Sequence, residues 1–207
     1  MFIDKLAVVN AALSTIGDSG LTDLQEDHAY RDLIVQFLGE VTDEICSKGY
    51  WFNQEYTRLQ PDANSKFIYV PTDVYSIVAL HTRGFSVAQL GRRMYNSTRQ
   101  TYEWTHPLSV RLTRKFDFDD LPYDAQRAIR DETIVRFQGR IDADRETKAD
   151  VMRVAQLSKE ELLRKDLQHQ KHNMLVRPGM EQNAYDAIGY GMGDNSPFPG
   201  PNVRMVF

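Results

Sequence analysis

The sequence predicts an α+β fold: an antiparallel-type helical bundle with an inserted small β module and an extended C-terminal arm. Three observations lead to this prediction. Hydrophobic residues recur at helical spacing before residue 55 and after residue 117, the period shortens toward two between them, and the C-terminal stretch is rich in glycine and proline. We therefore expect the helical body in residues 1–54 and 118–177, the β module in 55–117 and the arm in 178–207.

Two amphipathic helices are expected in the first part of the body. The first spans residues 4–16, with Asp4 as N-cap and apolar residues three or four positions apart, at Leu6, Val9, Leu13 and Ile16. The second ends at Gly49 and has one apolar stripe, formed by Tyr30, Ile34, Phe37, Val41 and Ile45. Seven residues are expected to be buried where these helices meet the β module: Leu13, Ile16, Phe37, Val41, Ile45, Trp51 and Phe52.

The β module is indicated by four short runs rich in β-branched and aromatic residues. The runs cover residues 67–70, 75–80, 101–104 and 109–112. Turn-forming stretches at 61–64, 83–84 and 96–97 separate them. The alternation fits a mostly antiparallel arrangement.

Two further helices are expected after the β module. Asp119-Asp120-Leu121-Pro122 is typical of a helix start, because acids and proline suit the first turn. Residues 142–171 then hold seven basic and seven acidic side chains around a thin apolar stripe, which predicts a long helix with a wet face. The stripe consists of Val151, Val154, Ala155, Leu162, Leu163 and Leu167.

The overall composition is that of a globular protein without a membrane span. Hydrophobic residues make up 42% and charged residues 26%, and no apolar run is long enough to cross a bilayer. The net charge of −4 argues against tight nucleic-acid binding, although a local basic patch would be compatible with it. The single cysteine, Cys46, excludes an intrachain disulfide and fits a small buried residue. An acid at Asp4 argues against a signal peptide.

No pattern in the sequence favours a catalytic, cofactor-binding or metal site. His169 and His172 have helical spacing but lack the accompanying glutamate of a zinc motif, so we interpret them as surface residues. Asp117, Asp119 and Asp120 resemble a carboxylate pair, but helix capping explains them more simply. The glycines of 189–193 follow no predicted strand, so a nucleotide loop is not indicated.

Basic and aromatic side chains are mixed in the β module. Such a mixture occurs at protein interfaces and also on nucleic-acid surfaces, and we favour the interface. The candidate interface residues here are Arg92, Arg93, Tyr95, Tyr102 and Trp104.

The C-terminal arm is a second candidate interface. Glycine and proline oppose a regular helix there, and the segment is too apolar to remain solvated by itself. We expect it to dock on a neighbouring subunit or partner through Phe198, Val203, Met205, Val206 and Phe207.

Four stretches, read in order, resemble the tail tubular protein A family, the adaptors of short-tailed double-stranded DNA bacteriophages. They are VNAALSTIG at 9–17, GYWFNQE at 49–55, the β segment with IYVPTD at 68–73 and YEW at 102–104, and FDDLP at 118–122 followed by Ala128-Ile129. The sequence departs from the family pattern at 18–20, where a proline-containing turn is usual, and at Tyr50, where Trp is commoner. The arm matches no family element.

The resemblance implies a structural protein without enzymatic activity, resident in the virion tail and synthesised in the host bacterial cytoplasm. It implies a homo-oligomeric ring of about twelve copies, with portal and tail nozzle proteins as partners and tail fibres as a further candidate. Double-stranded DNA would pass through the lumen without specific binding, and no membrane or cofactor would be involved. Three alternatives stay open: a head-completion connector of a long-tailed phage, a polysaccharide-degrading tail hydrolase, and a nucleic-acid binder.

Overall fold

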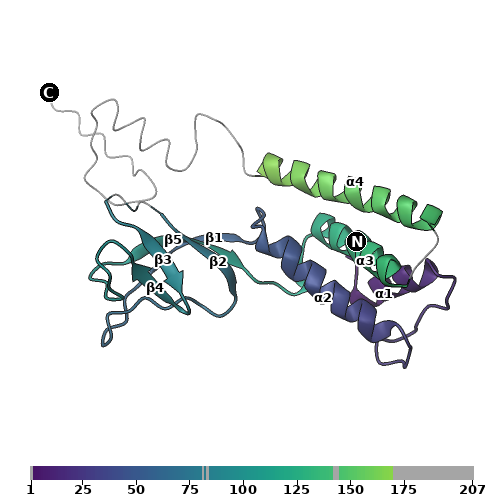
Figure 1. Ribbon diagram of the computed structural model, residues 1–207, viewed down its shortest axis with the longest axis horizontal. Coiled ribbons are helices and arrows are strands. Elements are labelled where there is room, and N and C mark those ends of the chain that lie inside the picture. The colour runs from purple at the N-terminus through teal and green to yellow at the C-terminus, as the bar shows by residue number, and fades with distance from the viewer. Residues whose placement is uncertain (1, 81, 83, 142–144, 170–207) are drawn as a thin grey trace. The chain divides into compact units, whose positions relative to one another are not determined.

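A computed structural model describes residues 2–80, 82, 84–141 and 145–169, and it confirms the α+β class. The helices and the strands form two groups, the helical body and the β module (Figure 1). The expected arm, residues 178–207, lies outside the described residues. The elements are α1 (Lys5–Ser14), α2 (Arg31–Ser47), β1 (Gln54–Leu59), β2 (Val74–Ala79), β3 (Val87–Leu90), β4 (Arg93–Asn96), β5 (Leu108–Arg114), a 3-10 helix (Phe118–Asp120), α3 (Tyr123–Arg140) and α4 (Arg145–His169).

Helices α1 and α2 form where the apolar spacing predicts them. Asp4 caps α1, because its carboxylate accepts a hydrogen bond from the Ala7 amide at 2.6 Å. Helix α2 ends at Ser47, and Gly49 follows with φ +76°, a left-handed conformation that glycine adopts without strain. The two predicted helix ends are therefore confirmed to within two residues.

The core of the helical body differs from the predicted one. Leu13, Val41 and Ile45 are buried, as expected, whereas Ile16, Phe37, Trp51 and Phe52 are only partly buried. The expectation that Leu13, Ile16 and Phe37 meet the β module is wrong. These three side chains pack beside Phe137 of α3 instead, and Leu38 rather than Phe37 occupies the fully buried position on α2.

Helix α3 lies at the centre of the body and packs against α1, α2 and α4. It begins at Tyr123, after a 3-10 turn, so Asp119 and Asp120 do not cap it as the sequence suggested. The buried Gln126 side chain secures this start: its amide nitrogen donates to the Phe118 carbonyl at 3.1 Å, and its oxygen accepts from the Ile3 amide at 2.9 Å. The predicted long charged helix is confirmed as α4 over Arg145–His169.

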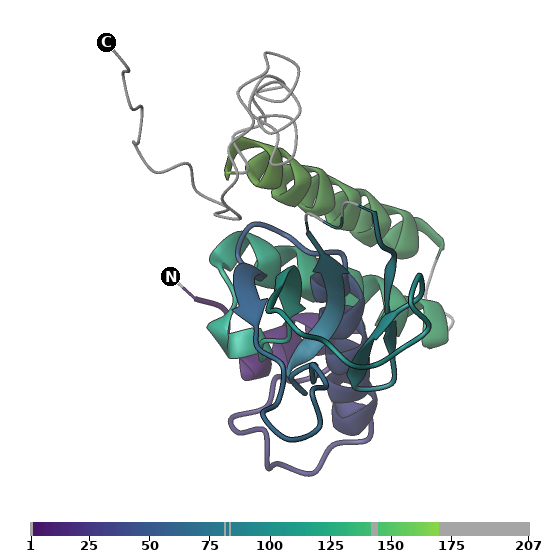
Figure 2. The ribbon, with the colours of Figure 1, turned by 90° about the vertical axis from the view of Figure 1, so that its left-hand side faces the viewer.

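The β module contains two small antiparallel sheets around one apolar core. A three-stranded sheet has the order β1-β5-β2, and β3 pairs with β4 in a hairpin. The β module faces the viewer in Figure 2. The predicted runs 75–80 and 109–112 form β2 and β5, whereas 67–70 and 101–104 make only isolated bridges. The core residues come from both sheets and the segments between them: Ile68, Val70, Met94, Trp104, Leu108, Val110 and Leu112.

Asn53 joins the helical body to the β module. Its side chain is buried, accepts from the Tyr50 amide at 2.8 Å, and donates to the carbonyls of Cys46 at 2.7 Å and Arg114 at 3.1 Å. One amide side chain thus provides hydrogen-bond partners both for backbone groups at the end of α2 and in the turn after it, and for a backbone carbonyl at the end of β5. The GYWFNQE stretch therefore forms the junction between the two parts.

Ion pairs reinforce this junction at its surface. The Arg114 guanidinium contacts Glu55 at 2.7 Å and Asp73 at 2.6 Å. Asp43 on α2 accepts a hydrogen bond from the Tyr75 hydroxyl at 2.5 Å and pairs with Lys115 at 2.9 Å. Burial raises the pKa of Asp43, but these two partners outweigh burial and hold the pKa below its usual value.

Cys46 is fully buried next to the junction, as the sequence predicted. Burial, with repulsion from Asp43, raises the pKa of its thiol to about 12, so the thiol stays protonated and unreactive at neutral pH. In the described part of the chain, no helix is both long and apolar enough to span a bilayer.

Candidate assembly interface

Three of the predicted interface residues form one cluster with Phe67 on the β module. The Arg93 guanidinium lies over the Tyr102 ring, 4.5 Å from its centroid, and 5.4 Å from that of Phe67. The Tyr95 and Tyr102 rings are 4.9 Å apart. Arg93 and Tyr95 point the same way because they alternate along β4. The two rings hold the Arg93 guanidinium in place through cation–π contacts.

Two predicted interface residues lie outside this cluster. Arg92 is exposed in the turn between β3 and β4. Trp104 is only 7% exposed, and its indole nitrogen donates to the Met94 carbonyl at 3.0 Å. Because it is buried, Trp104 belongs to the core of the module. The predicted residues that remain candidates for a contact surface are Arg92, Arg93, Tyr95 and Tyr102. Phe198, Val203, Met205, Val206 and Phe207 lie outside the described residues.

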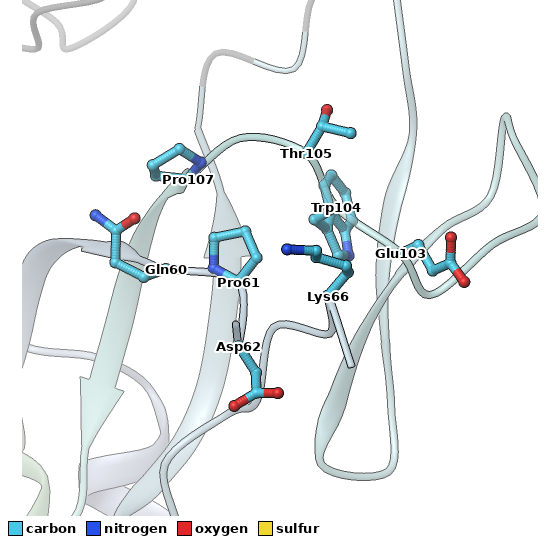
Figure 3. Close-up of a pocket in the computed structure, with 8 residues that line it drawn as sticks. All are labelled: Gln60, Pro61, Asp62, Lys66, Glu103, Trp104, Thr105 and Pro107. Atoms are coloured by element: carbon cyan, nitrogen blue, oxygen red, sulfur yellow. The ribbon is translucent and has the colours of Figure 1, made fainter. Parts of the chain in front are cut away.

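A shallow pocket of about 400 Å³ lies at the edge of the β module, with Lys66 beside the Trp104 ring (Figure 3). Two acids line it, Asp62 and Glu103. The Asp62 carboxylate accepts hydrogen bonds from Asn64 and Ser65, which lower its pKa, so it stabilises its own turn. Asp62 therefore has a structural role in its own turn, and nothing in the pocket lining indicates a catalytic pair of acids.

The acids considered for polysaccharide hydrolysis are also held in structural contacts or lie away from a cleft. Asp119 pairs with Lys5 at 3.1 Å. The two best-defined pockets of the described residues are lined by residues other than Asp117, Asp119 and Asp120. A glycosidase needs both carboxylates on either side of a bound sugar. The arrangement gives no support for this chemistry.

The histidine pair considered for metal binding is only half described. The His169 ring stacks on Trp51 at 4.7 Å, with the two planes 8° apart, and His172 lies outside the described residues. Among the described residues, no group of three histidine, cysteine, aspartate or glutamate side chains could hold a metal ion.

Helix α4 carries an exposed apolar surface that sequence reasoning missed. Five side chains, between 42% and 57% exposed, form what we call the α4 surface: Met152, Val154, Leu157, Leu163 and Leu167. The sequence placed Val154, Leu163 and Leu167 in the same buried stripe as Ala155 and Leu162. Of that stripe only Ala155 and Leu162 are fully buried, because α4 packs against α3 along one narrow line.

Comparison of the sequence with known proteins identifies the family of the chain. The family model described as tail tubular protein matches residues 6–179. The chain belongs to the tail tubular protein family. Among curated members, tail tubular protein A of Klebsiella phage KP34 is 26% identical over 121 residues. The aligned region covers 57% of this chain and 62% of that protein, so it spans less than two thirds of the relative.

Family membership places the chain among the structural proteins of the phage tail, as a component of the virion. The predicted resemblance is thereby confirmed. The GYWFNQE stretch has a structural role in this tail tubular protein, since Asn53 and Glu55 both hold the junction to β5.

Proposed function

We propose that this tail tubular protein is a ring-forming adaptor that joins the portal to the tail nozzle and provides a passage for DNA. The observation that carries the proposal is the family match over residues 6–179. The net charge of −4 supports it, because a channel that is not strongly basic lets a duplex slide instead of binding it. The proposed role is structural, with no catalytic step and with about twelve copies in the ring.

The β module between α2 and α3 favours this role over that of a head-completion connector, which is also built on a compact helical bundle. The cluster of Arg93, Tyr95 and Tyr102 supports a protein contact on that module. We propose it as a site for one of the two neighbouring tail components.

The adaptor role is tested by mixing the purified chain with the portal and nozzle proteins of the same phage. We expect the chain to bind each one separately and to link them in a ternary complex by size-exclusion chromatography. The Arg93→Ala variant should weaken binding to one of the two partner proteins, whereas its binding to the other should equal that of the unmodified chain. If the chain binds neither protein, the adaptor proposal is wrong.

The C-terminal arm is proposed to dock on an adjacent subunit, the portal or the nozzle. The support comes from composition: residues 178–207 hold few charges, and the five candidate contact residues are apolar, namely Phe198, Val203, Met205, Val206 and Phe207. A segment that orders only on docking contributes to assembly rather than to the stability of its own subunit.

Deletion of residues 195–207 should therefore leave the melting temperature of the monomer nearly unchanged while weakening assembly. Differential scanning calorimetry and sedimentation velocity measure the two effects. A full-length variant with serine at Phe198 and Phe207 serves as a control for chain length. A truncated chain that melts much earlier yet assembles normally would place the arm in the core of its own subunit.

A further inference from the structure

We propose that the α4 surface is the face on which one copy of this chain packs against a neighbouring copy in the ring. The inference rests on the proposed ring and goes beyond it, because it names the contact face. Helix α4 packs on α3, and its other side faces away from the remaining described elements (Figure 1).

The exposed apolar residues lie along the two flanks of the outward-facing side of α4. Met152 and Leu163 are about three helical turns apart, and Leu167 follows one turn later, so these three share one side. Val154 and Leu157 lie on the other flank. Half-exposed aliphatic side chains spread along one helix mark an interaction surface when no described residue covers them.

Contacts with α3 hold α4 in this orientation. Ala155, Ser158 and Leu162 are 0 to 2% exposed and form the buried line. On its flanks, three ion pairs connect the helices: Lys159 with Glu132 at 2.8 Å, Lys165 with Asp124 at 2.8 Å, and Glu161 with Arg127 at 3.0 Å. Rotating α4 so that its exposed leucines were buried against α3 would break these ion pairs. The α4 surface therefore remains directed outward.

A groove beside Val154 indicates which kind of side chain a neighbouring copy would contribute to the contact. It measures about 150 Å³, and its walls are Ile134, Val151 and Val154, with Asp131 and Asp150 as its acids. Asp131 is 4% exposed; its Oδ1 pairs with Arg130 at 2.6 Å, whereas its Oδ2 has no hydrogen-bond partner in the described structure. Apolar walls with acids fit the aliphatic stem and charged end of an arginine or lysine.

A second copy of the chain is the occupant that fits best. Asp150 already pairs with Arg153 at 3.7 Å, so the unpaired acceptor of the groove is Asp131 Oδ2. Exposed arginines without an ion-pair partner among the described residues, such as Arg92, Arg99 and Arg140, carry the group that would complement it on a second copy. Closed rings require two unlike surfaces on each copy, and an acidic, apolar face that takes up a basic side chain meets this requirement. The 25-residue helix is about 37 Å long, enough for an interface of standard size.

The test compares two full-length variants that place the same charge at an exposed aliphatic position. Leu163→Glu changes the α4 surface, and Val35→Glu changes α2, where Val35 is 40% exposed and lies outside that surface. Glutamate is a good helix former, so both variants should keep the fold. Mass photometry measures the fraction of chains in rings at a concentration where the unmodified chain is mostly assembled.

We expect Leu163→Glu to lower the ring fraction at least tenfold and Val35→Glu to leave it near that of the unmodified chain. Both variants should melt within a few degrees of the unmodified chain. Normal rings in Leu163→Glu, or equal losses in both variants, would overturn the α4 inference alone. Much earlier melting of Leu163→Glu would also overturn it, since residues 170–207 of the same chain would then cover Leu163. An unmodified chain that forms no rings would instead reject the proposed ring.

Discussion

Replacing Phe137 by Ala should lower the free energy of unfolding by about 3 to 5 kcal/mol, because the change leaves a cavity at the centre of the helical body. The Phe137 side chain is fully buried on α3 and packs in one cluster with Leu13, Ile34 and Ile134. The Tyr30 ring packs against it in a T-shaped arrangement, with the centroids 5.6 Å apart. Urea denaturation followed by circular dichroism measures the loss.

Phe37→Ala is the matched control, because it removes the same atoms from a phenylalanine in the same cluster that is only partly buried. Its effect should be clearly smaller, since part of the Phe37 surface is already in contact with water. Equal losses for the two variants, or a larger loss for Phe37→Ala, would show that the packing of α2 on α3 is misassigned.

Replacing Asn53 by Ala should cost about 2 to 5 kcal/mol, because it leaves the Tyr50 amide and the carbonyls of Cys46 and Arg114 without their hydrogen-bond partner. Thermal unfolding measures the loss. Asn64→Ala makes the same substitution at an exposed turn residue and should change the stability by less than about 0.5 kcal/mol.

Asn53→Asp separates the two kinds of hydrogen bond at the junction. The carboxylate can still accept from the Tyr50 amide, but it places negative charge against two carbonyl oxygens, so this variant should also be destabilised. A stable Asn53→Ala variant would mean that the helical body and the β module are held together chiefly by other contacts across the junction, such as those of Asp43 with Tyr75 and Lys115.

Elements with strong local signals were predicted well from the sequence. Asp4 and Gly49 set the ends of α1 and α2 through local backbone chemistry, which the sequence displays directly. The hairpin of β3 and β4 was missed because each strand is only four residues long, too short for alternation to be visible. Its turn depends on a single glycine, Gly91, with φ +61°.

For adjacent apolar residues on a helix, the sequence could not predict which one is fully buried, because this depends on neighbours distant in the chain. Phe37 and Leu38 are both apolar, and the position of α3 decides that Leu38 is enclosed. In the same way, Leu162 is buried and Leu163 is half exposed, although the two are adjacent and chemically identical. The α4 surface therefore became visible only in three dimensions.

The candidate cluster on the β module was predicted in part. Arg93, Tyr95 and Tyr102 come together, whereas Trp104 lies below them, in the core. Phe67 was missed as a member of this cluster. Alternation along 67–70 carries the signal: Ile68 and Val70 face inward, so Phe67 is placed on the opposite side.

Electron microscopy of the purified full-length chain, without any other tail protein, tests the central claim that this tail tubular protein forms a ring. The account predicts closed rings of about twelve copies with an open lumen, in which α4 lies at the boundary between neighbouring copies. Particles that remain monomeric at every concentration up to the limit of solubility would contradict it.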